Sequence, residues 1–315
     1  MHITMLRTTS RLRVGLLLAG SICFATLANA HPQLERFTVT AAGQQLAVWS
    51  RRPVHPQGVV VLVHGRTWSA RTAFYFEPRS GSRSLLKALA AAGYATYAVD
   101  LPGYGASARD PTGWLAPSRA VQDVEAVLHF AAIRHADLPA PVLLGWSRGS
   151  KLSALVATRA KQPLSALILY AYTLDPSAPP SNGAASGTAP AAPNTSESAR
   201  EDFVSPNVAS PALIQDFVIA ALATDPTRVD VCCDAEFLDI RPESIRVPTL
   251  LIQGERDPSI KPEVAAAFVA HLGAEDRRWI VIAHGDHAAH LEDTAPKVAA
   301  AMVEFIRASL TDVHR

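Results

Sequence analysis

A serine stands between two glycines in the stretch LLGWSRGSKL, residues 143–152. The residues before the serine are typical of a buried strand, and those after it are typical of an amphipathic helix. The tight turn joining such elements needs the small residues Gly145 and Gly149, and it projects the hydroxyl of Ser147 above the strand end. The N-terminus of the helix adds partial positive charge there. We therefore predict that Ser147 is a nucleophile rather than a turn residue.

A serine hydroxyl needs a general base, and three histidines in the stretch IAHGDHAAHLED, residues 282–293, compete for that role. His284 follows too closely on a strand-like run, and His290 lies where the last helix is expected to begin. A glycine and an aspartate supply a turn directly before His287, which lets its side chain swing back towards Ser147. We predict that His287 is the base and that His290 is a packing residue.

A carboxylate should orient the imidazole and stabilise its charged form. Asp257 and Asp175 both follow strand-like runs, in LLIQGERDPSI and LILYAYTLDPS, and both should lie at the carboxyl edge of the sheet. Asp257 is preferred because its strand directly precedes the unit that delivers His287. Asp175 stays open as the alternative.

The oxyanion of an acyl-transfer reaction needs two hydrogen-bond donors. We expect these to be the backbone N–H groups of Arg148, which follows the serine, and of Arg66 in the loop HGRTW. Trp68 in the same loop is a candidate wall of the substrate pocket. The side chains of Arg66, Arg71 and Arg148 are interpreted as a solvated rim rather than a site for an acidic substrate, and His64 as a residue that fixes its loop.

The elements that must position these residues alternate along the chain. Short apolar runs typical of buried strands are separated by segments with helical spacing, which predicts an α/β fold with a doubly wound, mostly parallel sheet. The stretch at 36–53 alternates apolar and polar residues around a glycine, and it predicts an antiparallel edge hairpin. The strand-like runs are 58–65, 94–100, 141–147, 165–172, 248–257 and 277–285, and the helical segments are 82–93, 118–136, 149–161, 261–273 and 295–310.

The alternation breaks between the sixth and seventh principal strands. Residues 176–200 contain no Leu, Ile, Val, Phe, Trp or Tyr, so this stretch is expected to be a mobile linker or lid tip. A helix is expected to begin at Ser210 and Pro211 and to run to about Ala223. We interpret residues 177–245 as a small, partly disordered cap, inserted between core segments 31–176 and 246–315.

Five motifs resemble the α/β-hydrolase fold superfamily, in particular its serine esterase and lipase-like branch with a cap insertion. VLVHG, YAVDLPGYGAS, GWSRG, LLIQGERDP and GDHAAHLED occur in the order of that family, within residues 45–310. The resemblance implies that Ser147 is the nucleophile, Asp257 the acid and His287 the base. The sequence departs from the family at Asp286, where glycine is frequent, and at Arg148, where a hydrophobic residue or glutamine is frequent.

The N-terminus is typical of a signal peptide. Three arginines precede an apolar run of 14 residues, and the segment 1–30 ends in ANA. That run is shorter than the roughly 20 residues that a membrane-spanning helix needs, so we expect cleavage after Ala30 and a secreted or periplasmic protein without stable membrane insertion. The mature chain would carry 26 basic and 28 acidic side chains, a net charge of −2, which does not favour nucleic acid as a partner.

The resulting hypothesis is a serine hydrolase that cleaves a small-molecule carboxylic ester through an acyl-enzyme, with no metal and no organic cofactor. The alternatives are C–C bond hydrolysis, amide hydrolysis or acyl transfer by the same residues, and a non-catalytic binding protein with the same fold. The mature chain keeps only Cys232 and Cys233. Since a disulfide between neighbours is strained, two thiols are expected.

Overall fold

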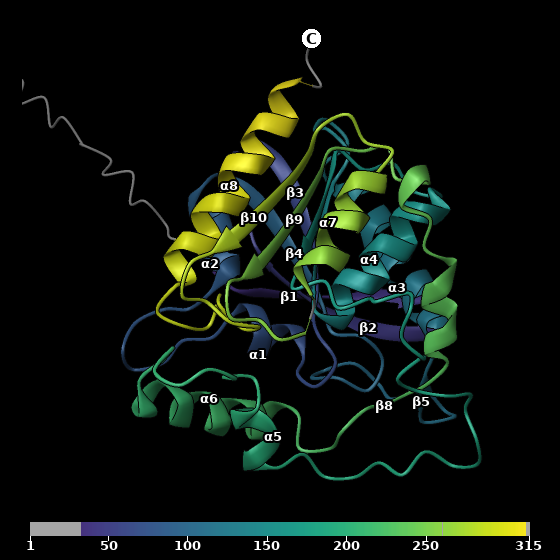
Figure 1. Ribbon diagram of the computed structural model, residues 1–315, viewed down its shortest axis with the longest axis vertical. Helices are drawn as coiled ribbons and strands as arrows, with labels where there is room; N and C mark the ends of the chain where they lie inside the picture. The colour runs from purple at the N-terminus through teal and green to yellow at the C-terminus, as the bar shows by residue number, and fades with distance from the viewer. Residues whose placement is uncertain (1–32, 260, 313–315) are drawn as a thin grey trace, which may run out of the picture. The chain divides into compact units, whose positions relative to one another are not determined.

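The computed structural model describes residues 33–259 and 261–312, which form an eight-stranded sheet in the order β1-β2-β4-β3-β6-β7-β9-β10. The expected signal peptide, residues 1–30, lies outside the described residues. The predicted fold class is confirmed, because six consecutive strands of the sheet run parallel to one another and helices cover both of its faces (Figure 1).

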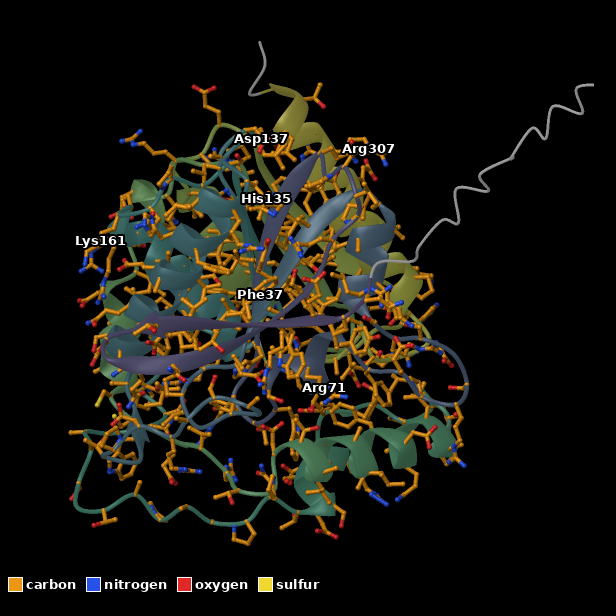
Figure 2. All side chains as sticks on the ribbon, turned by 180° about the vertical axis from the view of Figure 1, so that it is seen from behind. Phe37, Arg71, His135, Asp137, Lys161 and Arg307 are labelled. Carbon is orange, nitrogen blue, oxygen red and sulfur yellow. The ribbon has the colours of Figure 1, made fainter. Side chains whose placement is uncertain are left out.

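The edge hairpin is confirmed. Strand β1 (Glu35–Ala41) pairs antiparallel with β2 (Gln44–Arg51) through a turn in which Ala42 and Gly43 both have positive φ. Strand β2 in turn pairs antiparallel with β4, which attaches the hairpin to the parallel sheet. Phe37 of β1, labelled in Figure 2, packs against Phe130, and the centroids of the two rings lie 5.7 Å apart.

The parallel strands are almost entirely apolar, as expected for strands with helices on both faces. Every residue is buried in five of them, and only β10 at the edge is partly exposed. The strands are β3 (Gly58–Val63), β4 (Tyr94–Val99), β6 (Val142–Trp146), β7 (Ala166–Tyr170), β9 (Thr249–Gly254) and β10 (Arg277–Ile282).

Two apolar clusters, one on each face of the sheet, make up the core. Helices α3 (Pro117–Arg134), α4 (Arg148–Arg159) and α7 (Pro262–His271) cover one face. Helices α1 (Ala70–Phe74), α2 (Leu85–Ala91) and α8 (Ala295–Asp312) cover the other. No helix in the described ranges is long and apolar enough to cross a membrane.

The segment predicted to be a cap contains two α-helices, α5 (Ser196–Arg200) and α6 (Pro211–Thr224). In Figure 1 they lie beyond the end of the sheet towards which β9 and β10 point. Helix α6 confirms the helix expected from Ser210 and Pro211. The stretch 176–200 was expected to hold no regular structure, which is wrong for its last residues, because Thr195 caps α5 through a reciprocal pair of hydrogen bonds with Ser198.

The same segment carries short elements that the sequence analysis did not anticipate. Strand β8 (Asp230–Val231) pairs in parallel with β5 (Trp114–Leu115), which lies outside the main sheet. Two 3₁₀ helices follow, η1 (Asp234–Asp239) and η2 (Pro242–Ser244). These elements return the chain to β9.

Candidate active site

Ser147 occupies the turn between β6 and α4, with φ of 55° and ψ of −120°. The backbone of a non-glycine residue with these φ and ψ angles is strained, and the close packing of the two neighbouring glycines holds Ser147 in this conformation. A Cβ on Gly145 would lie 2.2 Å from the Gly149 carbonyl oxygen, and one on Gly149 would lie 2.2 Å from that of Val63. Only glycine fits at either position. The backbone N–H of Ser147 donates to the Tyr170 carbonyl on β7 at 2.9 Å, which fixes the turn to the neighbouring strand.

Three side chains from different loops form a continuous hydrogen-bonded chain. The Ser147 Oγ lies 2.9 Å from His287 Nε2, and His287 Nδ1 lies 3.0 Å from Asp257 Oδ2. The serine follows β6, the aspartate follows β9 and the histidine follows β10. The carboxyl ends of these parallel strands lie at one edge of the sheet, so residues far apart in sequence meet there. The structure thus brings together the three residues to which the sequence analysis assigned a triad.

The charges around His287 favour its protonated form. Burial alone would lower the pKa of His287, but the hydrogen bond and charge of Asp257, with smaller effects of Asp202 and Asp286, raise it above its ordinary value. Burial alone would raise the pKa of Asp257, and the bonds from His287 and Ser259 hold it below its usual range. The ionised carboxylate keeps the proton of the neutral imidazole on Nδ1, and it stabilises the imidazolium that forms once Nε2 accepts a proton.

Asp175, the alternative acid, does not contact His287 in this structure. Its carboxylate instead accepts hydrogen bonds from the N–H and the hydroxyl of Ser177, at 3.0 and 2.6 Å.

Ser259 is a neighbour of the site that the sequence analysis missed. Its N–H donates to Asp257 Oδ1 at 2.8 Å, and its Oγ lies 3.0 Å from His287 Nδ1.

The other histidines have different surroundings. His290 is buried between the Tyr170 hydroxyl, 3.1 Å from its Nδ1, and the Ala73 carbonyl, 3.0 Å from its Nε2. Burial lowers the pKa of His290 to about 3, so it is a neutral packing residue as expected, although α8 begins only five residues later. His284 is exposed beside Glu255.

His64 fixes its loop, as the sequence analysis interpreted it. Its Nδ1 donates to the Gly65 carbonyl at 2.9 Å, and its Nε2 accepts from the Leu101 N–H at 3.1 Å. Burial lowers the pKa of His64 to about 4. The ring is therefore neutral, and both of its nitrogens are occupied.

Asp286 links the cap segment to the histidine loop. The side chain is fully buried, and its two oxygens accept from the N–H of Ser205 at 2.8 Å and from that of Ala288 at 3.1 Å. Its own N–H donates to Glu292 Oε2 at 3.2 Å. Burial, together with the neighbouring Asp286 carboxylate, raises the pKa of Glu292 to about 9, so one proton resides on this buried acid at neutral pH.

Trp68 lies beneath the cap and is 1% exposed. Its ring packs edge-on against Phe217 of α6 at 6.1 Å between centroids, and its Nε1 faces the carboxyl group of Asp202. Neither that Nε1 nor Asp202 Oδ2 makes a hydrogen bond of good geometry within the described residues. Burial raises the pKa of Asp202 to about 7. The substrate contact assigned to Trp68 stays a prediction, and Asp202 is a second residue near His287 that the sequence analysis missed.

The two expected oxyanion donors lie on adjoining loops. A Cβ built on Gly65 would lie 3.4 Å from the Cβ of Ser147, so the loop after β3 adjoins the serine. Arg148 is the first residue of α4, and its N–H therefore has no acceptor within the helix.

The interpretation of the arginine side chains as a solvated rim is wrong for Arg148, which is 6% exposed and pairs with Asp234. Arg71, labelled in Figure 2, is exposed as that interpretation expects, and its guanidinium lies 5.3 Å from the centroid of the Trp49 ring.

Within the described ranges, no cluster of three or more histidine, cysteine or carboxylate side chains could hold a metal ion. Cys232 and Cys233 are free thiols.

The sequence matches the model of the serine aminopeptidase family, S33, over residues 54–294. The chain belongs to this family of α/β hydrolases. It is accordingly a serine hydrolase with the α/β-hydrolase fold, as the motifs predicted. A search among curated proteins finds no match.

Solved structures with the same fold include several enzymes at low sequence identity. A thermophilic esterase from Thermogutta terrifontis aligns with a TM-score of 0.62 and 17% identity, over 88% of this chain and 99% of that one. The CarC serine hydrolase involved in carbazole degradation aligns with a TM-score of 0.61 and 18% identity, over 87% and 99%. The thioesterase domain from the curacin biosynthetic pathway aligns with a TM-score of 0.58 and 19% identity, over the same fractions. At these identities the likeness establishes the fold alone.

Proposed function

We propose that this serine hydrolase cleaves carboxylic esters through an acyl-enzyme, with Ser147 as nucleophile, His287 as general base and Asp257 as the orienting acid. The observation that carries the proposal is the unbroken chain of hydrogen bonds from the Ser147 hydroxyl to the Asp257 carboxylate, at 2.9 and 3.0 Å. A hydroxyl becomes nucleophilic when a neutral imidazole accepts its proton, and this geometry provides for that transfer.

The reaction proceeds in two halves. Ser147 Oγ attacks the ester carbonyl carbon while His287 Nε2 takes the hydroxyl proton, and the resulting imidazolium is stabilised by Asp257. The same proton passes to the leaving alcohol as the C–O bond breaks. Water then attacks the acyl-enzyme by the same route, which releases the carboxylic acid and regenerates the serine.

The N–H groups of Arg66 and Arg148 bind the oxyanion of each tetrahedral intermediate in this proposal. Removing one donor of such a site costs roughly 10²–10³ in turnover in other hydrolases. The adjoining positions of their loops and the placement of Arg148 at the N-terminus of α4 support this assignment.

Amide hydrolysis is the second candidate, and the name of the matching family favours it. An aminopeptidase must hold the ammonium group of its substrate, for which a carboxylate close to the reacting bond is the natural partner. Asp202 is a carboxyl group whose charge acts on His287. The solved structures with this fold that are named as esterases support ester hydrolysis, so we favour ester substrates.

A substrate panel tests the proposal on the mature protein. We expect turnover of p-nitrophenyl acyl esters of increasing chain length, and covalent labelling by a fluorophosphonate, both lost in Ser147→Ala. Turnover of aminoacyl p-nitroanilides without turnover of the esters would establish the aminopeptidase instead. If the protein is neither labelled nor turns over any of these substrates, the proposed activity is refuted and a binding protein with this fold remains.

We also propose that the protein is exported and processed after Ala30. The arginines, apolar run and ANA sequence of residues 1–30 support this. The N-terminal sequence of the protein recovered from the producing cells should begin at His31.

A further inference from the structure

The side chain of Arg148 is committed to a buried ion pair. Its Nη1 lies 2.5 Å from Asp234 Oδ1, and the two side chains are 7% and 4% exposed. The guanidinium also lies over the ring of Phe237, 5.0 Å from its centroid. A pair this deeply buried is costly to break from one side, because the remaining charge would lack a partner. Asp234 therefore holds the first turn of α4, on which the Arg148 N–H is located.

Asn182 extends this contact to the other expected donor loop. Its Nδ2 donates to Asp234 Oδ2 at 2.6 Å, and its Oδ1 accepts from Arg66 Nη2 at 3.2 Å. An amide turned the other way would direct its NH₂ group at the guanidinium and its oxygen at the carboxylate, so only one orientation satisfies both neighbours. A four-residue chain thus runs from Arg148 through Asp234 and Asn182 to Arg66.

The backbone holds the middle of this chain in place. The Asp234 N–H donates to the Asn182 carbonyl at 3.0 Å, and the Cys233 N–H donates to the Gly183 carbonyl at 2.7 Å. Cys233 itself has a φ of 62°, in the left-handed region that a non-glycine residue adopts only when its neighbours impose it. At the far end, the carbonyl of Arg66 accepts a hydrogen bond from the Tyr104 hydroxyl.

We infer that Asp234 and Asn182 are positioning residues that set the spacing of the two oxyanion donor loops, through the side chains of the donor residues themselves. This inference rests on the proposed function, since it assumes that the N–H groups of Arg66 and Arg148 bind the oxyanion. The segment after β7 thereby acts as a brace across the catalytic edge of the sheet. Neither positioning residue needs to touch the substrate.

The decisive variant is Asn182→Ala, because Asn182 is partly exposed and its loss leaves the buried ion pair intact. Ser181→Ala, at an exposed neighbouring position in the same segment, is the matched control. Each protein is tested on an ester and on the corresponding thionoester, in which sulfur replaces the carbonyl oxygen. Sulfur is a weak hydrogen-bond acceptor, so the thionoester gains little from well-placed N–H donors.

For Asn182→Ala we expect kcat for the ester to fall about tenfold, a fraction of the 10²–10³ lost with a whole donor. KM, the thionoester rate and the melting temperature should stay close to those of Ser181→Ala, so the preference for the ester over the thionoester shrinks about tenfold. Asp234→Asn should reduce that preference further, with a lower melting temperature because Arg148 loses its partner.

Equal losses on both substrates would show that Asn182 acts on general stability, and would overturn the inference. An Asn182→Ala protein with the same kcat for the ester as Ser181→Ala would also overturn the inference. Either result leaves the proposed function standing if the wild-type protein turns over the ester. A wild-type protein that Ser147-directed fluorophosphonate fails to label would instead remove the proposed function, and the inference with it.

Discussion

Replacing Asp257 by asparagine leaves the size of the side chain almost unchanged and reverses a single hydrogen bond. The Ser259 N–H donates to Oδ1 of the carboxylate at 2.8 Å, so the amide oxygen of the variant takes that position. Its NH₂ group then faces His287 Nδ1, which at present donates to Oδ2 across 3.0 Å. The amide is a donor there, so Nδ1 must lose its proton and Nε2 must carry it.

A protonated Nε2 cannot accept the Ser147 proton across the 2.9 Å between them. The same change in another serine hydrolase lowers kcat about 10⁴-fold by imposing the wrong tautomer. Ser259 Oγ, 3.0 Å from Nδ1, can still accept from an Nδ1–H and retain some of the productive tautomer. We therefore expect a fall in kcat of about 10³–10⁴, roughly 4–5.5 kcal/mol in activation free energy at 1.36 kcal/mol per power of ten.

The assay is steady-state hydrolysis of a p-nitrophenyl ester, together with the rate at which a fluorophosphonate labels Ser147. KM should change little, because Asp257 is buried behind the imidazole. Asp175→Asn is the matched control, since it makes the same chemical change in the loop after the neighbouring strand β7 and should alter kcat less than twofold. An Asp257→Asn enzyme that keeps a tenth or more of wild-type activity, or a crippled Asp175→Asn enzyme, would refute the assignment of the acid.

Three further perturbations test other parts of the site. Because the pKa of His287 is raised and the ring must be neutral to act as a base, kcat/KM should fall as the pH drops through an apparent pKa above 6.5, which a pH–rate profile measures. Glu292→Gln should raise the melting temperature more at pH 8 than at pH 5, since the raised pKa of Glu292 means that ionising it costs stability as the pH rises; a shift independent of pH would contradict the buried proton. Gly149→Ala should lower both the melting temperature and kcat, because its Cβ would lie 2.2 Å from the Val63 carbonyl oxygen, and a wild-type rate would show that the turn can relax.

The parts of the site that could be predicted from the sequence depend on local patterns. The G-x-S-x-G spacing places Ser147 at a strand-to-helix junction, because only small residues fit on either side of the turn. The order of the strand-like runs then brought Asp257 and His287 to the same edge of the sheet. Parallel strands buried on both faces are nearly continuous apolar runs, so the strands of the sheet could also be predicted from the sequence.

The remaining contacts depend on tertiary structure that no local pattern specifies. Arg148 was expected at a solvated rim, but its partner Asp234 lies 86 positions later in the sequence. Asn182 lies in a stretch without large apolar residues. The backbone is held there by the Asp234 N–H, which donates to the Asn182 carbonyl, and by the Cys233 N–H, which donates to the Gly183 carbonyl. The paired strands β5 and β8 have two residues each, too few to show an alternating pattern.

The hydrogen bond between Asp286 and the Ser205 N–H has a consequence for engineering this protein. An exchange of the cap that includes Ser205 removes the only cap N–H that this buried carboxylate binds among the described residues. The buried acid beside His287 would then keep only the Ala288 N–H as a backbone donor, and a buried polar oxygen that loses its hydrogen bond costs about 1–3 kcal/mol. A functional chimera must therefore either carry a backbone donor at the position of Ser205 or replace Asp286 by glycine. The junctions of such a chimera are best placed after Ser205 rather than at the outer limits of the cap.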